Sequence, residues 1–135
     1  MNNGGRSYEH KEGVRQLFLD MMEEPQNSIR RTRPDGMYTS YYLDDAKLIK
    51  LILLDNRYSS DEKWRKDIPN DEKCNLGAKQ REWLKTEVMN SKARYTLIGA
   101  GISILPESSY SEKFYKRTRE FLIKIHNPKT SKKAS

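Results

Sequence analysis

Hydrophobic and polar positions follow two different periods along this chain, and the changes of period divide it into elements. From residue 8 to residue 22 the apolar positions recur at helical spacing, which predicts an amphipathic helix with one buried stripe. The stripe consists of Val14, Leu17, Phe18, Met21 and Met22. Glu23-Glu24-Pro25 ends the helix, because the residue before a proline disfavours the α region.

The next segment predicts a loop and then a strand. Residues Gln26 to Gly36 are polar, and the last four of them, Arg33-Pro34-Asp35-Gly36, are typical of a β-turn. Met37–Leu43 is rich in β-forming residues and is bounded by turn residues, so we expect a strand there. Asp44-Asp45 would then form a hairpin turn and not a paired-carboxylate site, because adjacent strand residues point to opposite faces.

The run Leu48–Leu54 admits two interpretations. Its short and nearly continuous apolar character favours a buried strand. The positions of Leu48, Leu51 and Ile52 also fit a short helix capped by Asp44. A long charged loop, Asn56–Asn75, follows in either case.

The second half of the chain predicts a helix, a strand and a further helix. Ala78–Met89 places Trp83, Leu84 and Val88 on one helical face, and Tyr95–Ile98 reads as a strand that runs into Gly99-Ala100-Gly101. A last helix begins near Ser111, a good N-cap, and repeats apolar positions along one side. These positions are Phe114, Thr118, Phe121, Leu122 and Ile125. The strand–helix–strand unit predicts an α/β fold with sites at the strand ends.

Composition limits the size and setting of this fold. The chain has 135 residues, of which 35% are hydrophobic and 33% charged, so it suits one domain with a thin core. It holds no apolar run of the roughly 18 residues that a membrane span needs, and Asn2-Asn3-Gly4-Gly5 is unlike a signal peptide, so the chain as written is expected to be cytoplasmic. Cys74 is the only cysteine, which rules out an internal disulfide.

The net charge of +7 raises the hypothesis of a nucleic-acid or anionic-surface binder. Three of these charges lie in the tail, at Lys129, Lys132 and Lys133, and a second group is Arg30, Arg31 and Arg33. The remaining charges are mixed in sign and no nucleic-acid motif accompanies them, so nucleic acid is not the expected main partner. We expect a partial domain over residues 1–126 and a basic, disordered tail over residues 127–135.

No familiar catalytic motif is present. His10 and His126 lie in none of the metal-binding histidine patterns, and we expect both to be surface residues at helix ends. Gly99-Ala100-Gly101 is not followed by a Walker lysine, so these glycines are expected to serve strand bending or close backbone approach. The serine-hydrolase motif G-x-S-x-G is absent too.

Several phrases do resemble one enzyme family when they are taken in order. Asn2-Asn3-Gly4-Gly5 resembles the residues after a D-D-H-D-Y-G segment, and residues 24–39 resemble G-E-P-x-x-S-P-R-R-x-R-x-G-x-Y. Leu53–Tyr58 resembles L-L-D-T-R, residues 76–84 match L-G-x-x-Q-x-x-W-L closely, and residues 98–106 are similar to G-S-G-x-Q-x-L-P. These are motifs of the alkaline phosphatase D-like (PhoD-like) metallophosphoesterases.

The resemblance implies a fold and an activity. The fold would be part of a metallophosphoesterase-type sandwich, an α/β arrangement with a mixed sheet flanked by three helices, and Leu48–Leu54 would be a strand. The activity would be calcium- or iron-dependent hydrolysis of phosphomonoesters or phosphodiesters. The family's metal ligands lie upstream, in D-D-H-D, and downstream, in G-D-x-H, so this chain alone is expected to hold no metal. Asn56 replaces the usual threonine and Ser103 the usual glutamine.

Asp55 and Arg57 are the candidate catalytic residues, since they end a predicted core strand. Arg57 could donate a bidentate pair of hydrogen bonds to a phosphoryl oxygen; alternatively, Asp55 and Arg57 form a local ion pair that fixes the loop. The expected function is a fragment of a PhoD-like phosphoesterase that is inactive alone. The alternative is a truncated, non-catalytic paralogue that binds protein partners or itself through exposed sheet edges.

Overall fold

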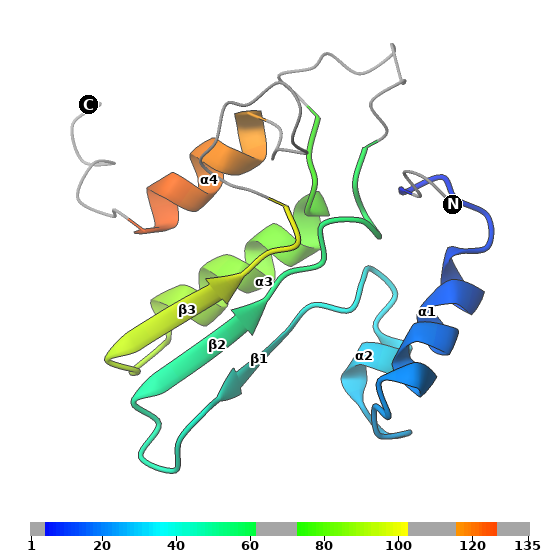
Figure 1. Ribbon diagram of the computed structural model, residues 1–135. Coiled ribbons are helices and arrows are strands. Elements are labelled where there is room, and N and C mark those ends of the chain that lie inside the picture. The colour runs from blue at the N-terminus through cyan, green and yellow to red at the C-terminus, as the bar shows by residue number, and fades with distance from the viewer. Residues whose placement is uncertain (1–4, 62–72, 103–115, 127–135) are drawn as a thin grey trace.

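The computed structural model describes residues 5–61, 73–102 and 116–126, which form a three-stranded sheet with four helices (Figure 1). The helices are α1 (Lys11–Met21), α2 (Ile29–Thr32), α3 (Gly77–Met89) and α4 (Lys116–His126). The strands are β1 (Thr39–Tyr42), β2 (Ile49–Leu53) and β3 (Tyr95–Gly99). The expected α/β class is therefore confirmed, and Leu48–Leu54 is a strand as the resemblance implied.

The sheet is mixed and has the order β1-β2-β3. β1 and β2 are antiparallel, with Tyr41 opposite Leu51, whereas β2 and β3 are parallel, with Leu51 opposite Leu97. The turn between β1 and β2 is held by the Asp44 carboxylate, which accepts hydrogen bonds from the backbone N–H groups of Leu48 (2.9 Å) and Ile49 (2.7 Å). The predicted hairpin turn is thus confirmed, and Asp44 acts within it as a backbone acceptor.

α3 connects the parallel pair and packs against one face of the sheet, as parallel strands require (Figure 1). The core lies between this face and the helices. Its buried members are Ile52, Cys74, Leu76, Leu84, Ile102 and Leu122. Cys74 is therefore buried within the core, where a lone thiol behaves as a small apolar residue.

The opposite face of the sheet is apolar and remains partly open. Tyr41, Tyr95 and Leu97 are 42%, 55% and 52% exposed, and none of the described strand residues on this face carries a charge. These residues are Thr39, Tyr41, Ile49, Leu51, Leu53, Tyr95, Leu97 and Gly99. A sheet face that met only water would alternate with polar residues, so this face has the composition of one that another layer covers.

The predicted burial of α1 is wrong. Leu17 and Met21, which were expected in a buried stripe, are both 71% exposed, and the buried residues of α1 are Arg15 and Leu19. The cause is a set of hydrogen bonds that joins α1 to α2, which we call the polar tether. The guanidinium of Arg15 donates to the backbone carbonyls of Arg31 and Arg33, which turns this side of the helix towards α2.

The predicted loop over residues 26–36 contains a helical turn, α2, that the sequence reading did not anticipate. Ser28 caps it, since its hydroxyl accepts a hydrogen bond from the backbone N–H of Arg30 at 3.2 Å. The predicted start of the last helix near Ser111, the helix position of Phe114 and the tail over residues 127–135 lie outside the described residues. Thr118 and Leu122 of α4 are buried, as the pattern predicted.

Candidate functional site

A pocket lies where β2 and β3 end, and it contains both candidate residues. Because the two strands are parallel, their carboxyl ends meet at one edge of the sheet, where α/β proteins bind ligands. The pocket has a volume of about 300 Å³. It is lined by Phe18, Arg30, Met37, Leu53, Leu54, Asp55, Asn56, Arg57, Gly101 and Ile102.

The Asp55 carboxylate organises the loop that forms the pocket wall. One oxygen accepts the backbone N–H of Met37 at 2.9 Å, and the other accepts those of Arg57 and Tyr58, each at 3.0 Å. Gly36 approaches closely here, since a Cβ at this position would lie 3.1 Å from the Asp55 carboxylate. A carboxylate that accepts several backbone N–H groups fixes the backbone around it.

The backbone of Asp55 is held by Gln80 of α3. The Gln80 side chain, which is 1% exposed, accepts the Asp55 N–H at 2.9 Å and donates to the Asp55 carbonyl at 2.7 Å. It donates also to the Leu76 carbonyl at 3.1 Å. The side-chain amide of Gln80 therefore continues the pairing of β2 beyond its last residue, which gives a physical reason for glutamine within the L-G-x-x-Q phrase.

Arg57 is an exposed residue of the pocket wall. The hydrogen bond that joins it to Asp55 comes from the Arg57 backbone N–H. This hydrogen bond fixes the loop through the main chain of Arg57. The ion pair between the Asp55 and Arg57 side chains stays a prediction. The predicted catalytic role of Arg57 stays a prediction.

Asn56 joins the ends of the two parallel strands. Its side chain is buried, with the residue 4% exposed, and its Oδ1 accepts the backbone N–H of Gly101 at 2.8 Å. The side-chain Nδ2 is also buried and has no hydrogen-bond partner in the described part of the chain. The amide thus serves a structural purpose at the position where the family pattern has threonine.

Arg30 lines the pocket, whereas the sequence predicted it only as a member of a charged cluster. Its Nε donates to the Met37 carbonyl at 3.1 Å, and its Nη1 pairs with the Glu24 carboxylate at 2.6 Å. Ser28 donates to the other oxygen of Glu24 at 2.5 Å. The signal available in the sequence was the R-R phrase of the resemblance, but its spacing from Asp55 gave no indication that the two residues share a pocket.

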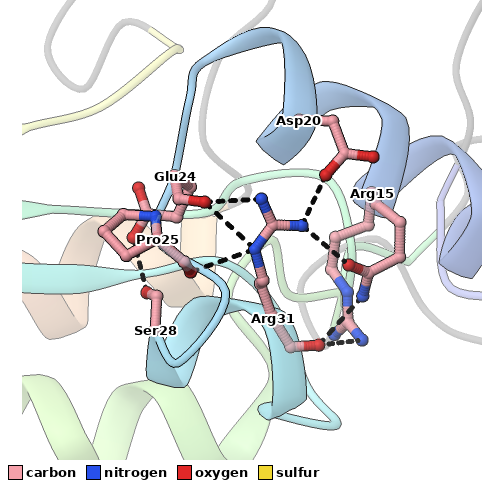
Figure 2. A network of polar contacts seen from close by, with 7 residues as sticks. Arg15, Asp20, Glu24, Pro25, Ser28 and Arg31 are labelled. Carbon is pink, nitrogen blue, oxygen red and sulfur yellow. Dashed lines mark hydrogen bonds and ion pairs between the residues drawn. The ribbon is translucent and has the colours of Figure 1, made fainter.

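The other two arginines of the cluster are used inside the protein, as Figure 2 shows for Arg31. Arg31 is 8% exposed, and it donates to Asp20 at 2.7 Å and to the Pro25 carbonyl at 3.0 Å. Arg33 donates to the Tyr38 carbonyl at 2.7 Å, and its guanidinium lies 4.0 Å from the centroid of the Tyr38 ring. These two side chains therefore act in folding the segment around α2.

Tyr38 shows how tightly that segment is packed. Its hydroxyl donates to Asp35 at 2.6 Å, and its ring lies 4.6 Å from that of Trp83 between centroids. Burial and the hydrogen bond to Asp35 raise the pKa of Tyr38 well above its ordinary value. The phenol therefore stays neutral and acts as a donor.

The described residues do not form a metal cage. Among them, no group of three or more histidine, cysteine, aspartate or glutamate side chains is placed to hold a metal ion. Asp55, the carboxylate in the pocket, already accepts three backbone N–H groups. The described residues therefore do not fit the calcium or iron that the resemblance implies. No described helix is long and apolar enough to cross a bilayer.

Comparison with known proteins gives one informative result. No family model matches the chain. No curated protein matches it. A solved structure of PhoD is similar over 95% of this chain, with a TM-score of 0.62 and 20% sequence identity. The fold is PhoD-like.

The match also defines how much of PhoD is represented. The chain spans 30% of the length of the PhoD structure that it matches. This agrees with the expectation of a partial domain. The likeness establishes the fold, whereas the activity of PhoD belongs to a protein more than three times as long.

Proposed function

We propose that this chain is a portion of a PhoD-like phosphoric ester hydrolase. The observation that carries the proposal is the PhoD-like fold, in which the strand ends of β2 and β3 form a pocket around the candidate residues. The pocket would bind the ester. The calcium or iron would be held by residues outside this chain, so the chain alone would be inactive.

Two residues would have distinct roles in this hydrolase. The Arg57 guanidinium would donate hydrogen bonds to the phosphoryl oxygens, which arginine does in a bidentate manner. Asp55 would act as a positioning residue. Its carboxylate accepts the backbone N–H of Arg57 at 3.0 Å and thereby fixes the position of the Arg57 backbone, from which the side chain extends.

A chimera tests this proposal. The segment of PhoD that matches this chain is replaced by the chain, and the purified chimera is assayed with p-nitrophenyl phosphate and bis-p-nitrophenyl phosphate in calcium and iron. We expect hydrolysis that a chelator abolishes. Replacing Arg57 by Gln in the chimera is expected to lower kcat/KM about tenfold or more, because a charge-assisted contact to the phosphoryl group is lost.

The matched control is Arg94→Gln, which changes an exposed arginine just before β3, at the opposite end of the strand from the pocket. It is expected to leave kcat/KM unchanged. A chimera that folds cooperatively and binds metal but hydrolyses neither ester would contradict the proposal.

A second candidate function is a protein-interaction module, and the open apolar sheet face favours it. Tyr95 and Leu97 are more than half exposed on that face, and Leu17 and Met21 are exposed on α1. Apolar residues that are exposed together on one sheet face are typical of interaction sites in soluble proteins. Analytical ultracentrifugation and thermal melting would distinguish the two candidates. A protein that stays monomeric over the whole accessible concentration range and also melts cooperatively would count against the module.

A further inference from the structure

The pocket has two chemically different sides. Arg30 and Arg57 supply guanidinium groups, whereas Phe18, Met37 and Ile102 supply apolar side chains. Leu53 and Leu54 extend the apolar side where β2 ends. A pocket of about 300 Å³ with this division suits a small ligand that is charged at one end and apolar at the other.

Two of the three guanidinium nitrogens of Arg30 are held by neighbouring groups. The Nε and Nη1 atoms are engaged by the Met37 carbonyl and by Glu24. The remaining nitrogen, Nη2, has no partner within the described residues. Because Glu24 is itself held by Ser28, the guanidinium is fixed before a ligand arrives, which reduces the entropy lost on binding.

The Asp55 carboxylate in the pocket wall is engaged by the protein backbone. Its two oxygens accept three backbone N–H groups, so they are already used in fixing the loop. The Nη2 group of Arg30 is a donor on this side of the pocket, and arginine forks match the oxygens of a phosphate. An oxyanion is therefore the ligand group that this side of the pocket favours.

One member of the apolar side, Phe18, comes from α1. Phe18 is 38% exposed on α1 and lines the pocket, while its neighbours Leu17 and Met21 face away at 71% exposure. An aromatic ring at the rim adds apolar contact area next to the guanidinium groups. The alcohol part of an ester would meet this side.

We propose that the pocket binds a phosphate ester whose alcohol is apolar, such as an aryl phosphate, with Arg30 contacting the phosphate and Phe18 the alcohol. The choice of an ester rests on the proposed function, and the proposal deepens it by naming the substrate class. Binding by these residues requires no metal. It can therefore be measured on this chain alone.

The experiment is a set of titrations in the presence of a chelator, followed by isothermal calorimetry or by amide chemical shifts. The ligands are phenyl phosphate, inorganic phosphate, glycerol phosphate and phenol. We expect phenyl phosphate to bind about tenfold more tightly than inorganic phosphate or glycerol phosphate, and phenol to bind weakest.

Two substitutions separate the two sides of the pocket. Arg30→Gln is expected to weaken phenyl phosphate and inorganic phosphate together, each by about tenfold or more. Phe18→Ala is expected to weaken phenyl phosphate severalfold and to leave inorganic phosphate unchanged. The controls are Arg94→Gln and Met21→Ala, which change exposed residues that do not line the pocket.

The outcomes are unambiguous for variants that unfold cooperatively. Equal affinity for phenyl phosphate and inorganic phosphate would overturn the assignment of an apolar alcohol, and undiminished binding by Arg30→Gln would overturn the phosphate site. If Phe18→Ala fails to fold, Phe18→Leu replaces it and should give a smaller loss for phenyl phosphate only. Failure of this proposal leaves hydrolysis by the chimera intact, whereas an inactive chimera leaves metal-free binding intact.

Discussion

Asp55 and Gln80 show how two side chains can be committed to the backbone at the point where a site is built. The Asp55 carboxylate takes three N–H groups of its own loop and of the segment before β1, and Gln80 takes the Asp55 peptide group. Their contribution to a site is geometric. The pocket wall also carries two arginines, Arg30 and Arg57.

Replacing Gln80 by Ala tests this backbone role. The substitution leaves the partly buried N–H and carbonyl of Asp55 without these partners, so we expect the free energy of unfolding to fall by about 1–3 kcal/mol. Urea denaturation measures it. The matched control, Lys79→Ala, changes an exposed neighbour on the same helix and should shift the value by less than about 0.5 kcal/mol. Equal losses in the two variants would contradict the role given to Gln80.

The residues of the pocket were only partly predictable. Asp55 and Arg57 could be found because they directly follow an apolar strand. Arg30 could not, since it joins the pocket through contacts with Met37 and Glu24 that depend on how the α2 segment folds back. Local patterns carry no information about such a return of the chain.

At the scale of elements, the strands followed their patterns and α1 did not. β2 and β3 are specified by short apolar runs, which need only local sequence to be recognised. The orientation of α1 is set by Arg15, whose partners Arg31 and Arg33 lie 16 and 18 residues away. An apolar stripe alone indicates a helix, but a tether of this kind decides which side faces the protein.

Two glycines at helix starts should respond in opposite ways to alanine. Gly77, the first residue of α3, has φ +71°, and a Cβ there would lie 2.9 Å from the Cβ of Ser59, so Gly77→Ala should cost about 1–3 kcal/mol of stability. Gly13 in α1 has open space around it, so Gly13→Ala should add up to about 1 kcal/mol. Thermal melting of both variants checks the pair; a stabilising Gly77→Ala would contradict the described backbone.

The contact between the sheet and α3 should make the free energy of unfolding depend on pH in the acid range. Glu87 of α3 pairs with the buried Lys50 of β2 at 2.6 Å and accepts from Ser40 at 2.8 Å. Burial by itself raises the pKa of Glu87, but these hydrogen bonds outweigh it and hold the pKa below its ordinary value of 4.5. The stabilisation is therefore complete above pH 4.5 and is lost as the pH falls through the lower, folded-state pKa.

The measurement is the free energy of unfolding of the wild type and of Glu87→Gln from pH 7 down to pH 3. The wild type should be the more stable at pH 7, and the difference between the two should shrink below pH 4.5 as Glu87 protonates. A difference that stays constant over this range would show that the ion pair does not set the pKa of Glu87.

At the scale of the whole molecule, the sheet is covered by a helix on one face and is partly open on the other, and the PhoD-like fold gives a reason. β2 buries Ile52 and Lys50 on the face that α3 covers, and its other face is apolar, which is typical of a strand with a layer on each side. α3 covers one face, and the other leaves Tyr41, Tyr95 and Leu97 exposed. The chain corresponds to 30% of the PhoD structure, so the proposed hydrolase would have further segments available to cover that face.

The most direct test of the central claim asks whether this chain carries catalytic chemistry or only the scaffold and pocket. The purified chain is titrated with calcium and with iron by calorimetry and is assayed in parallel for hydrolysis of p-nitrophenyl phosphate. We expect neither stoichiometric metal binding nor metal-dependent hydrolysis. One ion bound per chain, seen in a crystal with ligands from this polypeptide alone and accompanied by turnover, would contradict this expectation.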